Sequence, residues 1–126
     1  MNDAKPIRYE TRRDAHDGNV TRRRGLLHVF AVYAGEKGKT TEVEVPHNAM
    51  HSPDFMEQGY GGVGAEDLAR TIIGHWLGEK DPNRLVYSRF KAMLVSPAPQ
   101  LVPLRITAQQ IEGFFKLAQQ IEGGKK

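Results

Sequence analysis

The chain is divided into a strand-like half and a helix-like half by the stretch Gly59-Tyr60-Gly61-Gly62-Val63-Gly64-Ala65-Glu66-Asp67-Leu68-Ala69. Glycine loses much backbone freedom when it becomes ordered, so this cluster of glycines indicates positive φ angles or the close approach of another group. The acids Glu66 and Asp67 favour the first turn of a helix, where unpaired N–H groups stabilise negative charge. We therefore predict a loop between a sheet and a helix that begins near Ala65.

The residues before this stretch have the pattern of strands. Ile7 and Tyr9 alternate with charged residues, and residues 41–45 alternate in the same way, with Val43 and Val45 expected to face inward. Residues 26–33 form an apolar run rich in branched and aromatic side chains, which is typical of a central strand. We expect these segments to form an antiparallel sheet.

The residues after it have the pattern of helices. An apolar stripe follows Ala65, a second helix is predicted to begin at Asp81-Pro82, and Thr107 with Gln110 has the spacing of a capping box for a third. Residues 101–106 are predicted to form a short edge strand. The sequence therefore predicts an α+β fold in which a small antiparallel sheet of three to four strands packs against about three helices.

Composition limits the class of protein. The chain has 126 residues, which is the size of one domain, and we predict a single domain 1–126 with a basic N-terminal arm 1–24 and a C-terminal helix 107–122. It has no cysteine, which excludes disulfides, thiolate zinc sites and cysteine nucleophiles. No apolar run approaches the length of about 20 residues that a membrane-spanning helix needs. We expect a cytoplasmic protein without membrane contact.

Basic residues are concentrated at the N-terminus. Residues 1–24 hold seven lysines or arginines against four acids, whereas the remainder of the chain is balanced. Such a cluster can contact the phosphates of a nucleic acid. A solvated hairpin whose arginines protect a strand edge is the alternative, because acids lie between the arginines. The candidate nucleic-acid-binding residues are Arg12, Arg13, Arg22, Arg23 and Arg24.

The glycine-rich stretch is the candidate ligand site. Backbone N–H groups in such a loop, at the start of a helix, can bind phosphate or carboxylate. The stretch lacks the Gly-Lys-Ser/Thr sequence of a phosphate loop, and two acids in the first turn would repel an anion, so a purely structural turn is the alternative. The candidate ligand- or partner-binding residues are His51, Ser52, Tyr60, Gly61, Gly62 and Gly64.

The histidines do not predict a metal or a catalytic centre. His47 and His51 share one loop and His75 lies on the next predicted helix, but their spacing matches no strong metal signature, so we predict neither a metal nor a cofactor. His51 and Ser52 are adjacent, and adjacent side chains in an extended segment point in opposite directions. We predict that the protein is not an enzyme; a hydrolase or transferase built around His51 is the enzymatic alternative.

Several short motifs together resemble a known family. They are His51-Ser52-Pro53, Gly59-Tyr60-Gly61-Gly62-x-Gly64 followed by Leu68-Ala69, Leu85-x-Tyr87-x-x-Phe90-Lys91, and Leu104-x-Ile106-Thr107. Over residues 43–115 the chain resembles the domain-of-unknown-function family 6166, small proteins of phages, plasmids and bacterial genomes. The Gly-Tyr-Gly-Gly block is the specific part. The chain departs from the family pattern at Gln58, where an aromatic residue is expected, and at Val63 and Ala65, which replace a serine and a proline.

The resemblance implies a mobile-element setting without implying an activity. Small proteins of that setting often inhibit host defences by covering a partner surface or by sequestering a nucleotide signal. The leading hypothesis is a non-catalytic binding protein that acts on a host protein complex or on a small nucleotide through residues 47–64. The alternative is a nucleic-acid-binding accessory protein that uses the arginine-rich arm. A homo-oligomer is compatible with either hypothesis.

Overall fold

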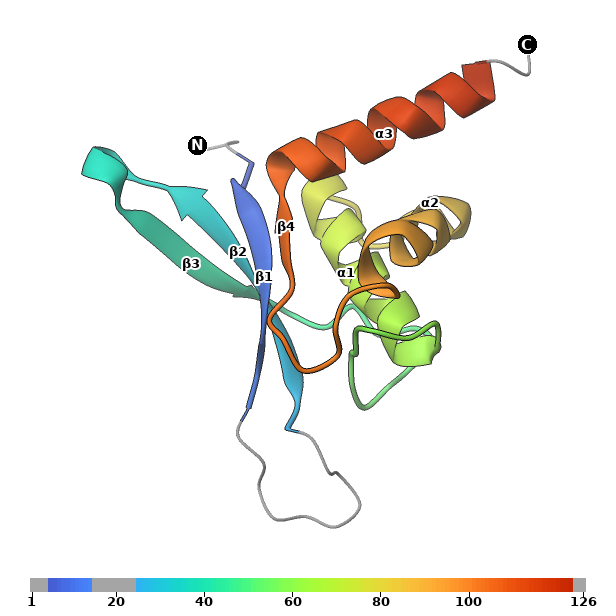
Figure 1. Ribbon diagram of the computed structural model, residues 1–126, viewed down its shortest axis with the longest axis horizontal. Helices are drawn as coiled ribbons and strands as arrows, with labels where there is room; N and C mark the ends of the chain where they lie inside the picture. Colours follow the sequence, from blue (N-terminus) through green and yellow to red (C-terminus); the bar gives the residue numbers. More distant parts are fainter. Residues whose placement is uncertain (1–4, 15–24, 124–126) are drawn as a thin grey trace.

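The computed structural model describes residues 5–14 and 25–123 (Figure 1). Four strands, three α-helices and a π-helical segment follow one another, and a short 3-10 turn at Glu36–Gly38 closes the hairpin between the second and third strands. The elements are β1 (Arg8–Arg13), β2 (Leu27–Ala34), β3 (Thr40–Val45), α1 (Val63–Leu77), α2 (Arg84–Phe90), the π-helical segment Lys91–Val95, β4 (Arg105–Thr107) and α3 (Ala108–Gly123).

The four strands form one antiparallel sheet in the order β3-β2-β1-β4. Tyr9 of β1 lies between Ala31 of β2 and Ile106 of β4. Residues 8–13 of the predicted arm therefore form an inner strand of the sheet. Residues 15–24, with Arg22, Arg23 and Arg24, lie outside the described residues.

One face of the sheet packs against the helices. Tyr9, Thr11 and Ile106 point to this face and are almost fully buried. The apolar stripes of the helices meet them, as the period of the sequence predicts. The predicted α+β class is confirmed. The core includes Tyr9, Val29, Ala31, Ile106, Leu68, Ile72, Phe90, Ile111 and Phe114.

The hairpin of β2 and β3 extends away from the helices (Figure 1). Val45, at its base, is 5% exposed, as predicted. Val43 shares the helix-facing side of the sheet, yet it is 51% exposed, so the expectation that it is covered is wrong. The reason is the position of the helices, which cover only the base of the hairpin.

Two predicted boundaries are corrected. α1 begins at Val63 rather than near Ala65, so Gly64 belongs to the helix. The cap of α2 is Asn83, whose Oδ1 accepts hydrogen bonds from the N–H groups of Leu85 (2.9 Å) and Val86 (3.3 Å). Asp81 instead forms an ion pair of 3.1 Å with Arg70.

The C-terminal helix begins as its sequence predicts. The Thr107 hydroxyl accepts a hydrogen bond of 3.1 Å from Gln110 N–H, and Gln110 Oε1 accepts one of 2.8 Å from Thr107 N–H. The two bonds form the reciprocal capping box. The preceding edge strand is β4, which is shorter and later than the predicted segment 101–106.

Candidate functional site

Residues 46–62 connect β3 to α1 without regular secondary structure, and the Asp67 side chain holds their first half in place. Asp67 is fully buried on α1. Its carboxylate accepts hydrogen bonds from the backbone N–H groups of His51 and Ser52, both at 2.9 Å, and of Met50 at 3.2 Å. His47 Nε2 donates a fourth bond of 2.8 Å. A buried carboxylate is stable when its lone pairs are satisfied in this way.

This environment keeps Asp67 ionised. Burial raises the pKa of Asp67, but the hydrogen bonds from His51 N–H, the His47 ring, and the Ser52 and Met50 N–H groups together outweigh it, so the pKa lies below the ordinary value of 3.8. Asp67 therefore serves as an internal anchor for the loop. The prediction that Asp67 lies in the first turn of the helix is wrong, because α1 begins at Val63 and only Glu66 lies in that turn; the contacts of Asp67 are to the preceding loop.

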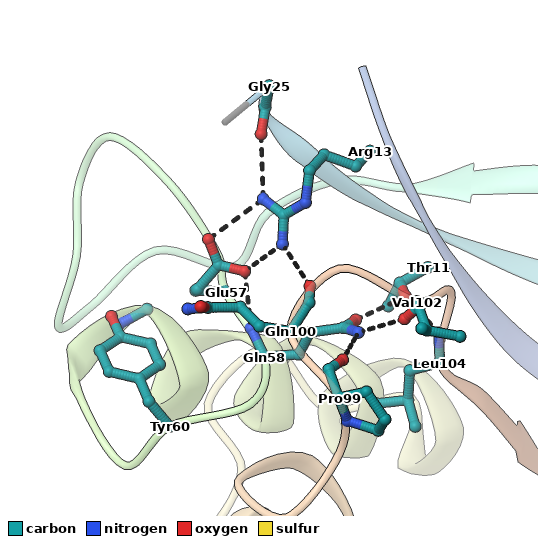
Figure 2. A network of polar contacts seen from close by, with 11 residues as sticks. Thr11, Arg13, Gly25, Glu57, Gln58, Tyr60, Pro99, Gln100, Val102 and Leu104 are labelled. Carbon is teal, nitrogen blue, oxygen red and sulfur yellow. Dashed lines mark hydrogen bonds and ion pairs between the residues drawn. The ribbon is translucent and has the colours of Figure 1, made fainter. Parts of the chain in front are cut away.

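A second anchor holds the other half of the loop against β1 (Figure 2). Arg13 makes a two-pronged ion pair with Glu57, of which the bond from Nη1 to Oε2 measures 3.1 Å. The same guanidinium donates bonds of 3.0 Å to the carbonyl oxygens of Gly25 and Gln100. One arginine thus ties together the sheet, the loop and the segment before β4. Both charged side chains are largely buried, so removing either one would leave the other as an unpaired buried charge.

Gln58 completes this anchor from inside the molecule (Figure 2). It is 1% exposed, and its Oε1 accepts a hydrogen bond of 2.6 Å from the Thr11 hydroxyl. Its Nε2 donates bonds to the carbonyl oxygens of Pro99 (2.8 Å) and Val102 (2.6 Å). Where the resemblance predicts an aromatic residue, this chain therefore has a polar side chain with its bonds satisfied.

The glycine cluster shows both features that the sequence predicts, a positive φ angle and the close approach of other groups. Gly59 has a φ of +79°, and a Cβ atom there would lie 2.7 Å from the Ala98 carbonyl oxygen. A Cβ atom on Gly62 would lie 2.3 Å from the Tyr60 ring. A Cβ atom on Gly64 would lie 2.8 Å from the Phe55 ring and 3.0 Å from the Tyr60 hydroxyl. The glycines therefore make room for two aromatic side chains of the same loop.

These side chains also cover the start of α1. The Tyr60 hydroxyl accepts a hydrogen bond of 3.3 Å from Gly64 N–H, so this donor already has a partner. Glu66, in the first turn, is 7% exposed and accepts a bond of 2.7 Å from the Ser88 hydroxyl. The same carboxylate pairs with Lys91 Nζ at 3.4 Å, so the charges beside the loop are balanced within the fold. The case for an anion-binding loop is weakened because the Tyr60 hydroxyl already takes the Gly64 donor.

The predicted ligand-binding residues fall into two groups. Tyr60, Gly61, Gly62 and Gly64 lie together around the start of α1, where Lys91 Nζ donates a bond of 3.3 Å to the Gly61 carbonyl oxygen. His51 and Ser52 lie at the Asp67 anchor instead. His51 Nε2 shares a bond of 2.8 Å with the buried Tyr87 hydroxyl.

Ser52 is only 2% exposed, so its side chain is not part of the surface. This burial follows from the Asp67 anchor, which draws the backbone of residues 50–52 toward α1.

Sequence reasoning named Tyr60 but did not single out Phe55 and Val63, the other exposed apolar side chains at this place. Phe55 is 40% exposed, Tyr60 36% and Val63 51%. The side chains of Phe55 and Tyr60 both lie against Gly64, and Val63 precedes Gly64 in the chain. We call Phe55, Tyr60 and Val63 the contact face. Met50, 62% exposed, lies on the same loop. The sequence feature that could have identified them is the presence of apolar and aromatic residues in a loop, where polar residues are usual.

The arginines of the described strand are engaged by acids of the same chain. Arg12 forms ion pairs with Glu42 (2.6 Å) and Glu10 (3.5 Å) and lies 4.4 Å above the centre of the Phe30 ring. Arg13 is bound by Glu57. Neither guanidinium is a free phosphate-binding group, so the nucleic-acid hypothesis depends on Arg22, Arg23 and Arg24, which lie outside the described residues.

The other two histidines of the described residues, His75 and His28, have partners within the fold. His75 Nδ1 and the Tyr9 hydroxyl share a hydrogen bond of 2.7 Å, and burial, with a smaller effect from Lys5, lowers the pKa of His75. His28 lies between Asp14 (3.0 Å) and Glu44 (2.8 Å). Within residues 5–14 and 25–123, no group of three or more histidine, aspartate or glutamate side chains is arranged to hold a metal ion.

Comparisons of the chain with protein-family models, with curated proteins and with solved structures find no match. The resemblance to family 6166 therefore stays a prediction. Among the described helices, none combines the length and the apolar character needed to cross a bilayer. The function proposed below therefore rests on the geometry of the contact face and its anchors.

Proposed function

We propose that the protein is a non-catalytic binding protein that recognises another protein through its contact face. The observation that carries this proposal is the exposure of Phe55 and Tyr60 on a loop that two buried anchors hold in place, together with Val63 at the start of the helix that follows. Aromatic side chains are enriched in protein interfaces and often dominate their binding energy.

The anchors favour tight binding because they fix the loop before a partner arrives. Ordering a flexible loop on binding costs free energy, and a preorganised loop avoids much of this cost. Asp67 holds residues 50–52, and the Arg13–Glu57 pair holds the segment that leads into the contact face. The buried acids thus support binding indirectly and do not contact the partner.

The local chemistry favours a protein partner over a nucleotide. The Gly64 N–H is bonded to the Tyr60 hydroxyl, and the Lys91 ammonium is paired with Glu66. A phosphate would have to displace these partners, whereas an apolar protein surface would cover the exposed rings. The mobile-element setting that the resemblance implies makes a complex of the host defence the partner class that we propose.

Affinity capture from cells of the native host tests the proposal. The tagged wild-type chain is compared with a contact-face variant, Phe55→Ser with Val63→Ser, and with a control variant, Met93→Ser with Leu117→Ser. The control residues are 46% and 42% exposed and lie on other elements. We expect a captured protein to be reduced about tenfold or more by the contact-face variant alone, because anchor residues dominate affinity. Equal loss with both variants would contradict the proposal.

A thermal-shift screen separates the protein and nucleotide versions of the hypothesis. A ligand that binds only the folded state raises the unfolding temperature as its concentration exceeds its Kd. We expect no shift of the wild-type chain with linear and cyclic nucleotides. A shift that disappears in Tyr60→Ala would replace the protein partner by a nucleotide.

A further inference from the structure

The outer edge of the sheet at β3 is open. β3 pairs with β2 on one side, and in the described part of the chain no segment pairs with its other side. Residues 40–44 are all exposed. An edge strand of six residues presents a row of backbone donors and acceptors that can accept another strand.

The register shows which residues carry these free groups. Asp14 N–H donates a bond of 2.8 Å to the Leu26 carbonyl oxygen, which marks even-numbered residues of β2 as those bonded to β1. Hydrogen-bonding direction alternates along a strand, so odd-numbered residues of β2 bond to β3, and their partners on β3 are residues 41, 43 and 45. The backbone groups of Thr40, Glu42 and Glu44 therefore point outward.

A pocket lies next to this edge on the helix-facing side. It has a volume of about 310 Å³ and lies where the end of β3 meets the second half of α1. Val43, 51% exposed, lies on the same side of the sheet. A strand added to β3 would place alternate side chains over Val43 and beside the pocket, which is how strand-adding peptides gain specificity. The lining includes Val45, His47, Thr71, Gly74, His75 and Gly78.

The other side of β3 determines the charge of a suitable partner. The side chains of Glu42 and Glu44 are 39% and 53% exposed there. Glu42 is paired with Arg12, whereas Glu44 shares the single His28 ring with Asp14, so the edge keeps a net negative charge at Glu44. If two copies of β3 paired antiparallel about a twofold axis, the Glu44 carboxylates would lie opposite or diagonal to glutamates of the other copy, and like charges across strands are destabilising. A strand with lysine or arginine opposite Glu44 would instead be attracted.

We propose that the free edge of β3 binds an extended segment of a partner protein as a fifth strand, with a basic residue opposite Glu44 and apolar residues facing Val43 and the pocket. This site is separate from the contact face, because β3 and the start of α1 lie at different ends of the fold (Figure 1). The edge of β3 is therefore a second binding surface, which recognises the backbone and the charge of an extended segment.

An NMR titration of the full chain with synthetic peptides tests this site. The probe is a peptide of alternating valine and lysine; its controls are the same peptide with glutamate in place of lysine, and the lysine peptide with alternate backbone amides methylated. We expect saturable changes at the amide signals of residues 40–45 with the lysine peptide. Binding should weaken about tenfold with either control, through charge repulsion in one and lost hydrogen bonds in the other.

Two variants of one residue separate backbone pairing from charge. Glu44→Pro removes an outward N–H while the bonds from β3 to β2 remain, since proline is tolerated at such edge positions. Glu44→Gln removes the same charge but keeps the N–H. We expect Glu44→Pro to bind the lysine peptide more weakly than Glu44→Gln, with the remaining amide spectrum unchanged. Equal binding by the two variants, or peptide-induced changes away from β3, would overturn the proposal.

Discussion

Thr11 and Gln58 are 47 positions apart in the chain, and the Thr11 hydroxyl donates a hydrogen bond of 2.6 Å to Gln58 Oε1 in the interior. The same hydroxyl accepts a bond of 2.8 Å from Leu104 N–H. Gln58 also bonds to the carbonyl oxygens of Pro99 and Val102. This pair therefore joins β1, the loop before α1 and the segment before β4 into one unit.

Gln58→Leu tests the energetic importance of this unit. The substitution removes the buried acceptor of the Thr11 hydroxyl and the donor to the Pro99 and Val102 carbonyl oxygens, so we expect a loss of about 2–4 kcal/mol in the free energy of unfolding. Chemical denaturation measures it. The exposed Gln109 offers a matched control, for which Gln109→Leu should change stability by less than about 0.5 kcal/mol. Similar small effects for both would show that the pair is unimportant.

Asp67→Asn tests the anchor of the contact loop. The new amide nitrogen would face N–H donors where a carboxylate oxygen now accepts, so we expect a loss of about 2–4 kcal/mol and faster hydrogen exchange at residues 50–52. Asp54→Asn, at an exposed position of the same loop, is the control and should leave both quantities unchanged. Unchanged exchange in Asp67→Asn would show that other contacts hold the loop.

The same carboxylate predicts a loss of stability in acid. Because the pKa of Asp67 is lower in the folded protein, its contribution is complete above the ordinary value of 3.8 and disappears as the pH falls through the folded value. The free energy of unfolding of the wild type should therefore decline below about pH 4 more steeply than that of Asp67→Asn. Parallel curves would contradict the assigned shift.

Two histidines predict pH effects of opposite sign. The pKa of His75 lies below 6.5, so its contribution is complete above that pH and is lost as the pH falls. The pKa of His28 is raised by the hydrogen bond that its ring donates to the Asp14 carboxylate and also by Glu44, so its contribution is complete below pH 6.5 and is lost as the pH rises through the folded value. The free energy of unfolding, measured from pH 5 to pH 8, checks both effects. Its decline toward acid pH should disappear in His75→Asn, and its decline toward alkaline pH should disappear in His28→Gln.

Each histidine variant serves as the control for the other. Asparagine at position 75 keeps an acceptor near Tyr9, so the pH dependence can be separated from the loss of the hydrogen bond. If both variants changed the same side of the curve, at least one of the two shifts would have the wrong sign.

Two glycines predict opposite responses to a methyl group. Gly59→Ala forces a side chain into a φ of +79° and against the Ala98 carbonyl oxygen, so we expect a loss of about 2–4 kcal/mol in stability. Gly113→Ala lies inside α3 with no atom within 4 Å of the new Cβ, so we expect a gain of up to about 1 kcal/mol. Thermal and chemical unfolding measure both, and a stabilised Gly59→Ala would contradict the described loop.

The sequence predicted the class of fold and most elements because their signals are local. The capping box of Thr107 and Gln110 and the apolar run of β2 depend on neighbours in the chain, and the structure confirms both. The start of α2 was placed wrongly at Asp81 because two suitable capping residues lie close together. In the structure Asn83 caps the helix, and Asp81 pairs with Arg70 of α1 instead.

The candidate site was predicted less completely, since its organising contacts join distant residues. Tyr60 and the glycines were found from composition, whereas Phe55 was not. The role of Asp67 could not be read from a pattern of side chains, because most of its partners are backbone N–H groups.

By itself, the sequence determined that a strand-rich half meets a helix-rich half at a glycine-rich junction, because hydrophobic period and glycine content act over a few residues. Only the tertiary structure decided what that junction presents. Packing across the chain placed Tyr60 and Phe55 over the start of α1 and left the edge of β3 open. Those outcomes depend on which distant surfaces fit together, and so they follow from three-dimensional packing and not from local sequence.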